Sequence, residues 1–120
     1  MSTVMGITSL KLNHEQKVNL VRTVDKHLST IFKSARAVTL QVVDPDFCTD
    51  LAKDQTTFFI CVPPQISIEK KREAIKLVND AMLEAVGYKG ELKVIVLFHY
   101  HTDDSVGKDG ELLSDMLMNK

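Results

Sequence analysis

The chain has 120 residues, of which 44% are hydrophobic and 26% are charged, the size and composition of one globular domain. Its formal net charge is −1 with acids and bases interspersed, so it lacks the positive field that nucleic acid or an anionic membrane attracts. It also lacks an apolar run long enough to span a bilayer and the features of a signal peptide. We therefore expect a cytoplasmic protein with no nucleic-acid and no membrane partner.

The sequence contains an internal repeat: the same pattern occurs twice, 54 positions apart and without a gap. Few residues are identical, but polar and apolar positions recur in the same order along both copies. Examples of the matched positions are Glu15 and Glu69, Lys17 and Lys71, Val24 and Val78, and Leu40 and Val94. We expect a single domain over residues 1–120, made of two pseudo-repeats at about 2–55 and 56–110.

The first unit opens with a short apolar run at residues 4–8, typical of a buried strand. Asn13, followed three residues later by Gln16, predicts a helix start closed by a capping box. Apolar residues then recur at spacings of three and four, which indicates a helix with one face on a sheet: Val18, Val21, Val24, Leu28 and Ile31. A longer strand is predicted at residues 37–43.

The second unit repeats this order, with a strand predicted at residues 58–62 and a cap at Ser67. Its helix ends at Gly87 and carries an apolar stripe made of Ile75, Val78, Met82, Ala85 and Val86. A strand at residues 92–100 follows. Residues 107–110, Gly-Lys-Asp-Gly, then predict a hairpin turn.

Each strand–helix–strand unit predicts a right-handed parallel crossover. Two units then give an α+β fold, with a four-stranded sheet and two helices on one face. Residues 58–62 and 94–98 are apolar at consecutive positions, so both faces of each strand are apolar. This is typical of strands covered on both faces. Because no further helix is predicted, we expect other copies of the chain to cover the second face in an obligate homo-oligomer.

Two groups of residues suggest metal or thiol chemistry. Cys48 and Cys61 have neither CxxC spacing nor a nearby set of partners, so we interpret them as buried or half-buried free thiols. His99 and His101 share a strand face, and Asp103 and Asp104 follow them, which is compatible with a divalent metal. Polar residues at a strand end explain the same pattern, and we expect no metal and no cofactor.

Three stretches of the chain resemble the tautomerase superfamily, which includes 4-oxalocrotonate tautomerase, malonate semialdehyde decarboxylase and macrophage migration inhibitory factor. Residues 13–32, which begin Asn-His-Glu-Gln-Lys, are similar to the first helix of the short tautomerases. Residues 92–97 and 105–112 are similar to the last strand and the glycine-bearing hairpin. The resemblance implies a homotrimer whose sheets enclose a central barrel, with a pocket between subunits.

In that family, the proline after the initiator methionine supplies an amine that moves a proton between carbon and oxygen of an enol or 2-oxo acid. Here the proline's place falls on Ser2, and its counterpart in the second unit is the internal Thr56. Removal of Met1 would give Ser2 an α-amine, whose ordinary pKa is about 7.7 to 8.0 and is lowered by burial or a nearby cation. The amine of Ser2 is therefore the candidate catalytic group.

The resemblance also implies that cations hold the substrate carboxylate. Lys33 falls where the inhibitory-factor branch has a substrate-binding lysine, although an exposed cation at a helix end is an equal explanation. Arg36 is a second candidate, and His99 or His101 is a candidate proton carrier near the pocket. The decarboxylase branch has two arginines where residues 62–66 read Val-Pro-Pro-Gln-Ile, so we do not expect decarboxylation.

Three functions stay open. The leading one is a tautomerase-superfamily protein that acts on, or descends from enzymes that act on, small 2-oxo or 2-hydroxy carboxylates. The second is a trimeric binding or assembly protein that has lost the amine base. The third is a metal-binding protein that uses His99 and His101.

Overall fold

The computed structural model describes residues 2–87 and 93–118. Two strand–helix–strand units follow one another: β1 (Ser2–Thr8), α1 (His14–Leu28) and β2 (Arg36–Val42), then β3 (Gln55–Val62), α2 (Ile68–Val86) and β4 (Lys93–Tyr100). The chain ends in a small hairpin and a short helix: β5 (Gly107–Lys108), β6 (Glu111–Leu112) and α3 (Leu113–Met118). The predicted order of elements in both units is confirmed, whereas α3 was not predicted.

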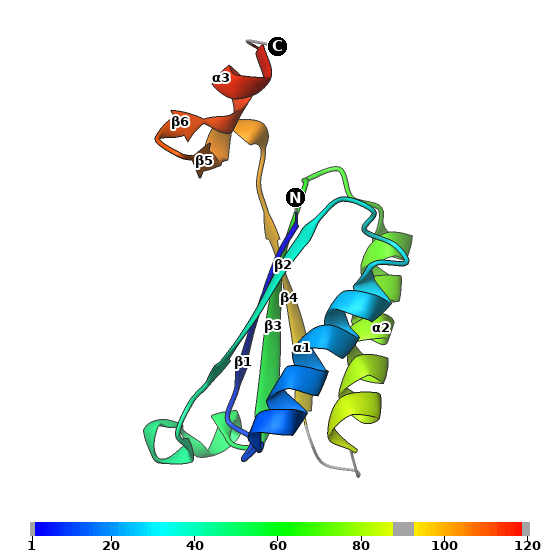
Figure 1. The fold of residues 1–120 in the computed structure, drawn as a ribbon, viewed down its shortest axis with the longest axis vertical. Coiled ribbons are helices and arrows are strands. Elements are labelled where there is room, and N and C mark those ends of the chain that lie inside the picture. Colours follow the sequence, from blue (N-terminus) through cyan, green and yellow to red (C-terminus); the bar gives the residue numbers. More distant parts are fainter. Residues whose placement is uncertain (1, 88–92, 119–120) are drawn as a thin grey trace.

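The main sheet has the strand order β2-β1-β3-β4. β1 is parallel to β2, β3 is parallel to β4, and the two units meet where β1 and β3 pair antiparallel. Both long helices lie on the same face of this sheet (Figure 1). The predicted α+β architecture and the two parallel crossovers are therefore confirmed.

The predicted helix boundaries follow from their caps. The amide of Gln16 donates to Oδ1 of Asn13 at 2.8 Å, and the amide of Asn13 donates to Oε1 of Gln16 at 2.9 Å, which completes the capping box of α1. In α2 only the first half of this pattern forms, since the amide of Lys70 donates to Oγ of Ser67 at 3.1 Å. α2 ends at Gly87, whose φ of 70° is the left-handed conformation that glycine adopts without strain.

The core lies between the sheet and the two helices, and three details differ from the predictions. Ile31 lies beyond α1, which ends at Leu28. Ile75 is exposed because α2 is turned so that its buried face consists of Ala74, Val78, Ala81 and Met82. β1, β2 and β3 begin before the predicted residues 4, 37 and 58, since they start at Ser2, Arg36 and Gln55.

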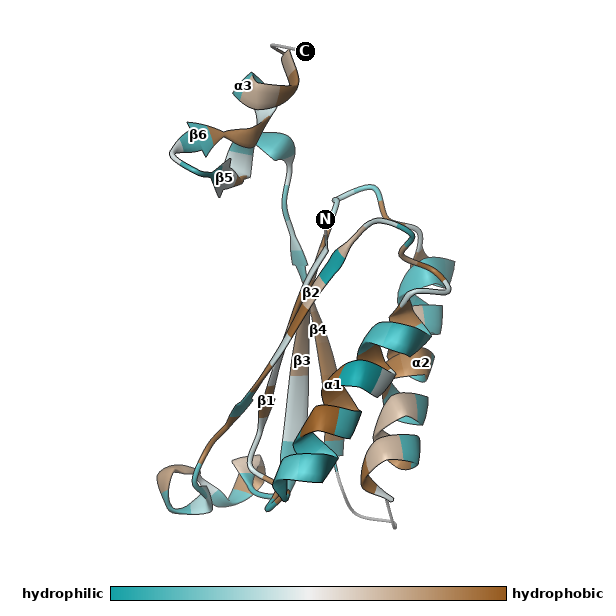
Figure 2. Cartoon of the chain, in the orientation of Figure 1, coloured by the Kyte–Doolittle hydropathy of each residue, from teal (hydrophilic) through white to brown (hydrophobic). Residues whose placement is uncertain are grey.

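The sheet face opposite the helices carries large apolar side chains. Met5, Ile7, Ile95 and Leu97 are between 36% and 48% exposed on this face, which we call the open sheet face. No helix in the described ranges 2–87 and 93–118 covers it, and Figure 2 shows stretches of hydrophobic colour along the strands. Surface of this kind is typical of a site of protein association.

The segments that follow β2 and β4 extend from opposite ends of the sheet. Two short 3₁₀ helices, at Pro45–Phe47 and Asp50–Ala52, connect β2 to β3. After β4, the predicted hairpin is confirmed, with Asp109 and Gly110 at φ of 52° and 84° in its turn. The hairpin and α3 project beyond the end of the sheet (Figure 1).

Among the described helices, none has the length and apolar character that a membrane-spanning helix needs. Leu92, predicted to open the last strand, lies outside the described residues, as does Met1.

Candidate functional site

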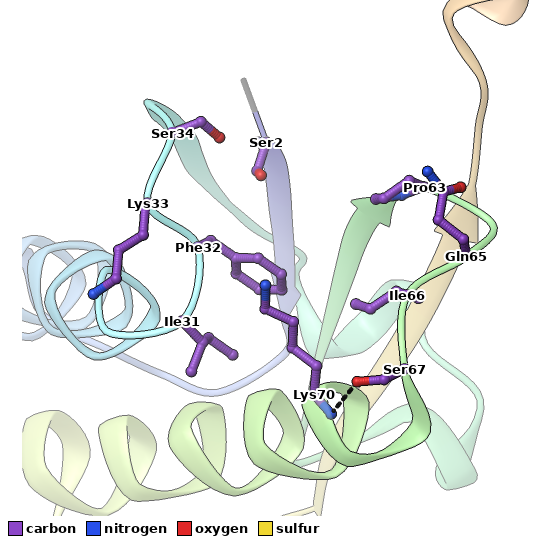
Figure 3. Close-up of a pocket in the computed structure, with 10 residues that line it drawn as sticks. All are labelled: Ser2, Ile31, Phe32, Lys33, Ser34, Pro63, Gln65, Ile66, Ser67 and Lys70. Carbon is purple, nitrogen blue, oxygen red and sulfur yellow. Dashed lines mark hydrogen bonds between the residues drawn. The ribbon is translucent and has the colours of Figure 1, made fainter.

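A cavity of about 490 Å³ lies at the end of the sheet where β1 begins (Figure 3). Four segments form it: the first residue of β1, the turn after α1, the loop between β3 and α2, and the first turn of α2. The residues that line it are Ser2, Ile31, Phe32, Lys33, Ser34, Pro63, Gln65, Ile66, Ser67 and Lys70. We call this cavity the Ser2 pocket.

Ser2 enters the pocket because of strand alternation. Val4, Gly6 and Thr8 point into the core, so Ser2 lies on the same helix-facing side of β1. Its backbone nitrogen donates to the carbonyl of Ala35 at 2.9 Å, which fixes the position of this nitrogen at the mouth of the pocket. Thr56, its counterpart in the second unit, is fully buried, and its Oγ1 lies 2.8 Å from Oγ1 of Thr8. As an internal residue, Thr56 has no amine to offer.

Lys33 lines the pocket, but its ammonium group is directed away from Ser2. Nζ lies 3.5 Å from the carbonyl oxygen of Ser29, near the end of α1. Figure 3 shows the side chain pointing from the turn toward α1 and not into the cavity. The structure therefore brings Lys33 to the pocket wall without aiming its charge at the N-terminal end of β1.

Arg36 is held by contacts within the chain. Its Nε donates to Oδ1 of Asp25 at 2.8 Å, and its Nη1 donates to the carbonyls of Phe32 at 2.8 Å and Ser34 at 3.0 Å. These bonds fix the turn between α1 and β2, and Arg36 does not line the Ser2 pocket.

His99 lies on the other face of the sheet. Val96 and Phe98 pack against the core, so the alternation of β4 places His99 on the open sheet face, beside Cys61 in the ladder with β3. The structure therefore does not bring His99 together with Ser2 within one chain. The residues 2–87 and 93–118 contain no group of three or more His, Cys, Asp and Glu side chains arranged to hold a metal.

The two thiols are half-buried and free, as predicted. Burial raises the pKa of the Cys61 thiol and so disfavours its thiolate form. Neither cysteine lines the Ser2 pocket.

Lys70 is the pocket residue that the sequence reasoning missed. It is exposed at the start of α2, and its Nζ lies over the ring of Phe32, 5.6 Å from the centroid. Figure 3 shows its side chain extending from the first turn of α2 into the cavity. One sequence signal was available, since Lys70 occupies the third position of its helix, where Gln16 closes the capping box of α1.

The charged side chains that line the pocket are all cationic. The lining contains two lysines and no carboxylate, and its apolar walls come from Ile31, Phe32, Pro63 and Ile66. Such a lining favours a small organic anion with an apolar body. Its side chains also include no histidine, aspartate, glutamate, cysteine or tyrosine. Apart from the amines of Lys33 and Lys70, the group in this pocket that could accept a proton is the α-amine that Ser2 would have without Met1.

Comparisons with protein-family models and with curated proteins give no match. Solved structures match over almost the whole chain. One is a wild-type fused 4-OT asymmetric trimer (TM-score 0.80, 10% identity, covering 95% of this chain and 98% of that one). Another is a wild-type fused 4-OT symmetric trimer (TM-score 0.78, 13% identity, 93% and 96% covered). A third is malonate semialdehyde decarboxylase (TM-score 0.74, 16% identity, 98% of each chain covered). At these identities the match is one of fold.

Proposed function

We propose that this chain, which has the fold of the tautomerase superfamily, acts on small 2-oxo or 2-hydroxy carboxylates, or descends from enzymes that did, by proton transfer in the Ser2 pocket. The observation that carries the proposal is the pocket itself. It lies at the start of β1, it holds two lysines and no carboxylate, and its walls are apolar. A carboxylate with a short carbon body fits that lining.

The proposed reaction is an isomerisation that needs no cofactor. With Met1 removed, the amine of Ser2 accepts the proton of the 2-hydroxyl group of a bound enol. The ammonium so formed delivers a proton to carbon 3, so that the 2-hydroxy-2-enoate becomes the 2-oxo acid and the amine is regenerated. The carbonyl of Ala35, which accepts a hydrogen bond from this nitrogen at 2.9 Å, would orient the amine.

We propose a homotrimer as the working assembly. The open sheet face exposes Met5, Ile7, Ile95 and Leu97, and the solved fused 4-OT structures that share the fold are trimers. Burying these side chains removes apolar surface from water at about 25 cal/mol per Å². A closed ring of three chains buries the face of every chain in the same way.

A second candidate function is a binding or assembly protein that has lost the base. Ser2 stands where the resemblance implies a proline, and apart from Lys33 and Lys70 no pocket side chain offers a base. The metal-binding alternative gains no support, because the described part of the chain holds no three-ligand cluster.

The test is Ser2→Pro, with removal of Met1 confirmed by intact mass. A proline at the N-terminus has a secondary amine and keeps an N–H for the carbonyl of Ala35. We expect weak or absent ketonisation of phenylpyruvate-type enols, which carry one carboxylate, by the wild type, followed by ultraviolet absorbance, and faster loss of absorbance with the variant. Ser2→Ala is the matched control, since its freed amine stays primary. No gain in a variant proven to begin with proline would favour the binding or assembly function.

A further inference from the structure

We infer that Lys70 is the group that binds the ligand's anion in the Ser2 pocket, and that the pocket takes monocarboxylates with a flat apolar body. The inference deepens the proposed function, on whose pocket it rests. Three observations carry it: the positions of the other two cations, the position of Lys70, and the nature of the remaining walls.

The other cations near the pocket are directed elsewhere. Arg36 is bonded to the carboxylate of Asp25 and to two backbone carbonyls. Lys33 lies against the last turn of α1, with Nζ 3.5 Å from the carbonyl oxygen of Ser29. Either side chain would have to leave these contacts before it could reach an anion beside Ser2.

Lys70 is placed differently. Its backbone amide is capped by Ser67, but its side chain does not return to the cap as that of Gln16 does at the same position of α1. Instead, Nζ lies over the face of Phe32 inside the pocket, and no residue in the described ranges accepts a hydrogen bond from it. The ring attracts the ammonium group and holds it in place while leaving its N–H donors free for a carboxylate.

The rest of the lining limits the ligand to one charge. Apart from Lys70, and from Lys33 whose ammonium group is directed toward α1, the walls consist of Ile31, Phe32, Pro63 and Ile66, with uncharged polar side chains between them. While Lys33 keeps that position, a second carboxylate would lie against these apolar walls without a cation, which costs its desolvation free energy. A flat apolar body would instead pack on them, and a cavity of about 490 Å³ accepts a molecule of the size of an aryl-substituted propionate.

The experiment measures binding of two unreactive probes, 3-phenylpropionate and the dicarboxylate glutarate, to the oligomeric protein by calorimetry at neutral pH and low salt. We expect 3-phenylpropionate to bind more tightly than glutarate. Lys70→Gln should weaken 3-phenylpropionate about tenfold, the effect of losing one charge-assisted hydrogen bond. This variant supplies the missing half of the capping box with Ser67, so its fold should be retained. Lys71→Gln is the matched control, because Nζ of Lys71 bonds to the hydroxyl of Tyr100 at 2.9 Å, outside the pocket lining.

Several results would overturn the inference: no binding of 3-phenylpropionate by the wild type, tighter binding of glutarate, or a loss of binding that follows Lys33→Gln and not Lys70→Gln. The outcome is separate from that of the proposed function. Loss of binding in Lys70→Gln, with no turnover gained in Ser2→Pro, supports the anion site and removes the enzymatic function. If Ser2→Pro turns over the enol and the addition of Lys70→Gln leaves its rate unchanged, the role of Lys70 is overturned and the proposed function stands.

Discussion

Arg36 and Asp25 form an ion pair that joins the first residue of β2 to α1, with Nε of Arg36 2.8 Å from Oδ1 of Asp25. The arginine side chain is 16% exposed, and it also satisfies the carbonyls of Phe32 and Ser34 in the turn between the two elements. The pair therefore stabilises the turn that carries the wall of the Ser2 pocket.

The first prediction concerns stability. Arg36→Ala should lower the free energy of unfolding by about 1–3 kcal/mol, because it removes a charge-assisted bond and leaves two carbonyls without a donor. Urea unfolding at a fixed protein concentration measures this. Arg22→Ala, at an exposed position of α1, should change the value by less than about 0.5 kcal/mol. An Arg36→Ala protein of normal stability that no longer binds 3-phenylpropionate would show that this arginine serves the ligand instead.

The second prediction concerns assembly. Leu97 on the open sheet face and Leu83 on α2 are 48% and 41% exposed, which makes them matched sites for the same change. Light scattering after size exclusion should give about three times 13.5 kDa for the wild type and for Leu83→Lys. Leu97→Lys should give a smaller or aggregated species, because a lysine on a covered sheet face is costly to bury. A wild-type monomer at micromolar concentration would contradict the proposed trimer.

The third prediction concerns the close packing of Gly6. A Cβ atom added at Gly6 would lie 2.7 Å from Cε1 of Phe58 and 3.0 Å from Cδ1 of Leu40. Phe58 is 1% exposed, so its ring has little room to move. Gly6→Ala should therefore cost about 1–3 kcal/mol of stability. Gly107→Ala is the control, since its added Cβ would be 3.7 Å from the nearest atom, and equal stability losses in the two variants would refute the packing argument.

The fold could be predicted from the sequence because its signals are local. Asn13 with Gln16, Ser67 and Gly87 mark helix ends by their own backbone chemistry, and the structure confirms each. Periodicity located the helices, but it did not fix the rotation of α2. Ile75 was included in the buried stripe for this reason, whereas Ala74 occupies the buried position.

The candidate site was less predictable, because its geometry depends on contacts between distant segments. Ile95 and Leu97 are as apolar as Val96 and Phe98, so the pattern of β4 did not reveal which face His99 shares. The role of Arg36 depends on the approach of α1 to β2. That of Lys70 depends on Phe32, a residue of the other unit, lying within reach of the first turn of α2. None of these relationships is encoded in spacing along the chain.

The last prediction concerns pH and the ion pair between the helices. Nε2 of His27 on α1 lies 2.8 Å from Oε2 of Glu84 on α2. The hydrogen bond from His27 lowers the pKa of the Glu84 carboxyl, and the charges of His27 and Lys26 add to this effect, which partial desolvation opposes. Because the folded-state pKa is the lower one, the stabilisation is complete above the usual glutamate pKa of about 4.3 and is lost as pH falls through the folded-state pKa.

Glu84→Gln should therefore lower Tm near pH 6 and have the same Tm as the wild type near pH 3, as measured by circular dichroism melts across this range. Glu73→Gln, at an exposed position of the same helix, should show no such pH-dependent difference. A Tm difference between wild type and Glu84→Gln that stays constant from pH 6 to pH 3 would show that the contribution of Glu84 does not depend on its charge.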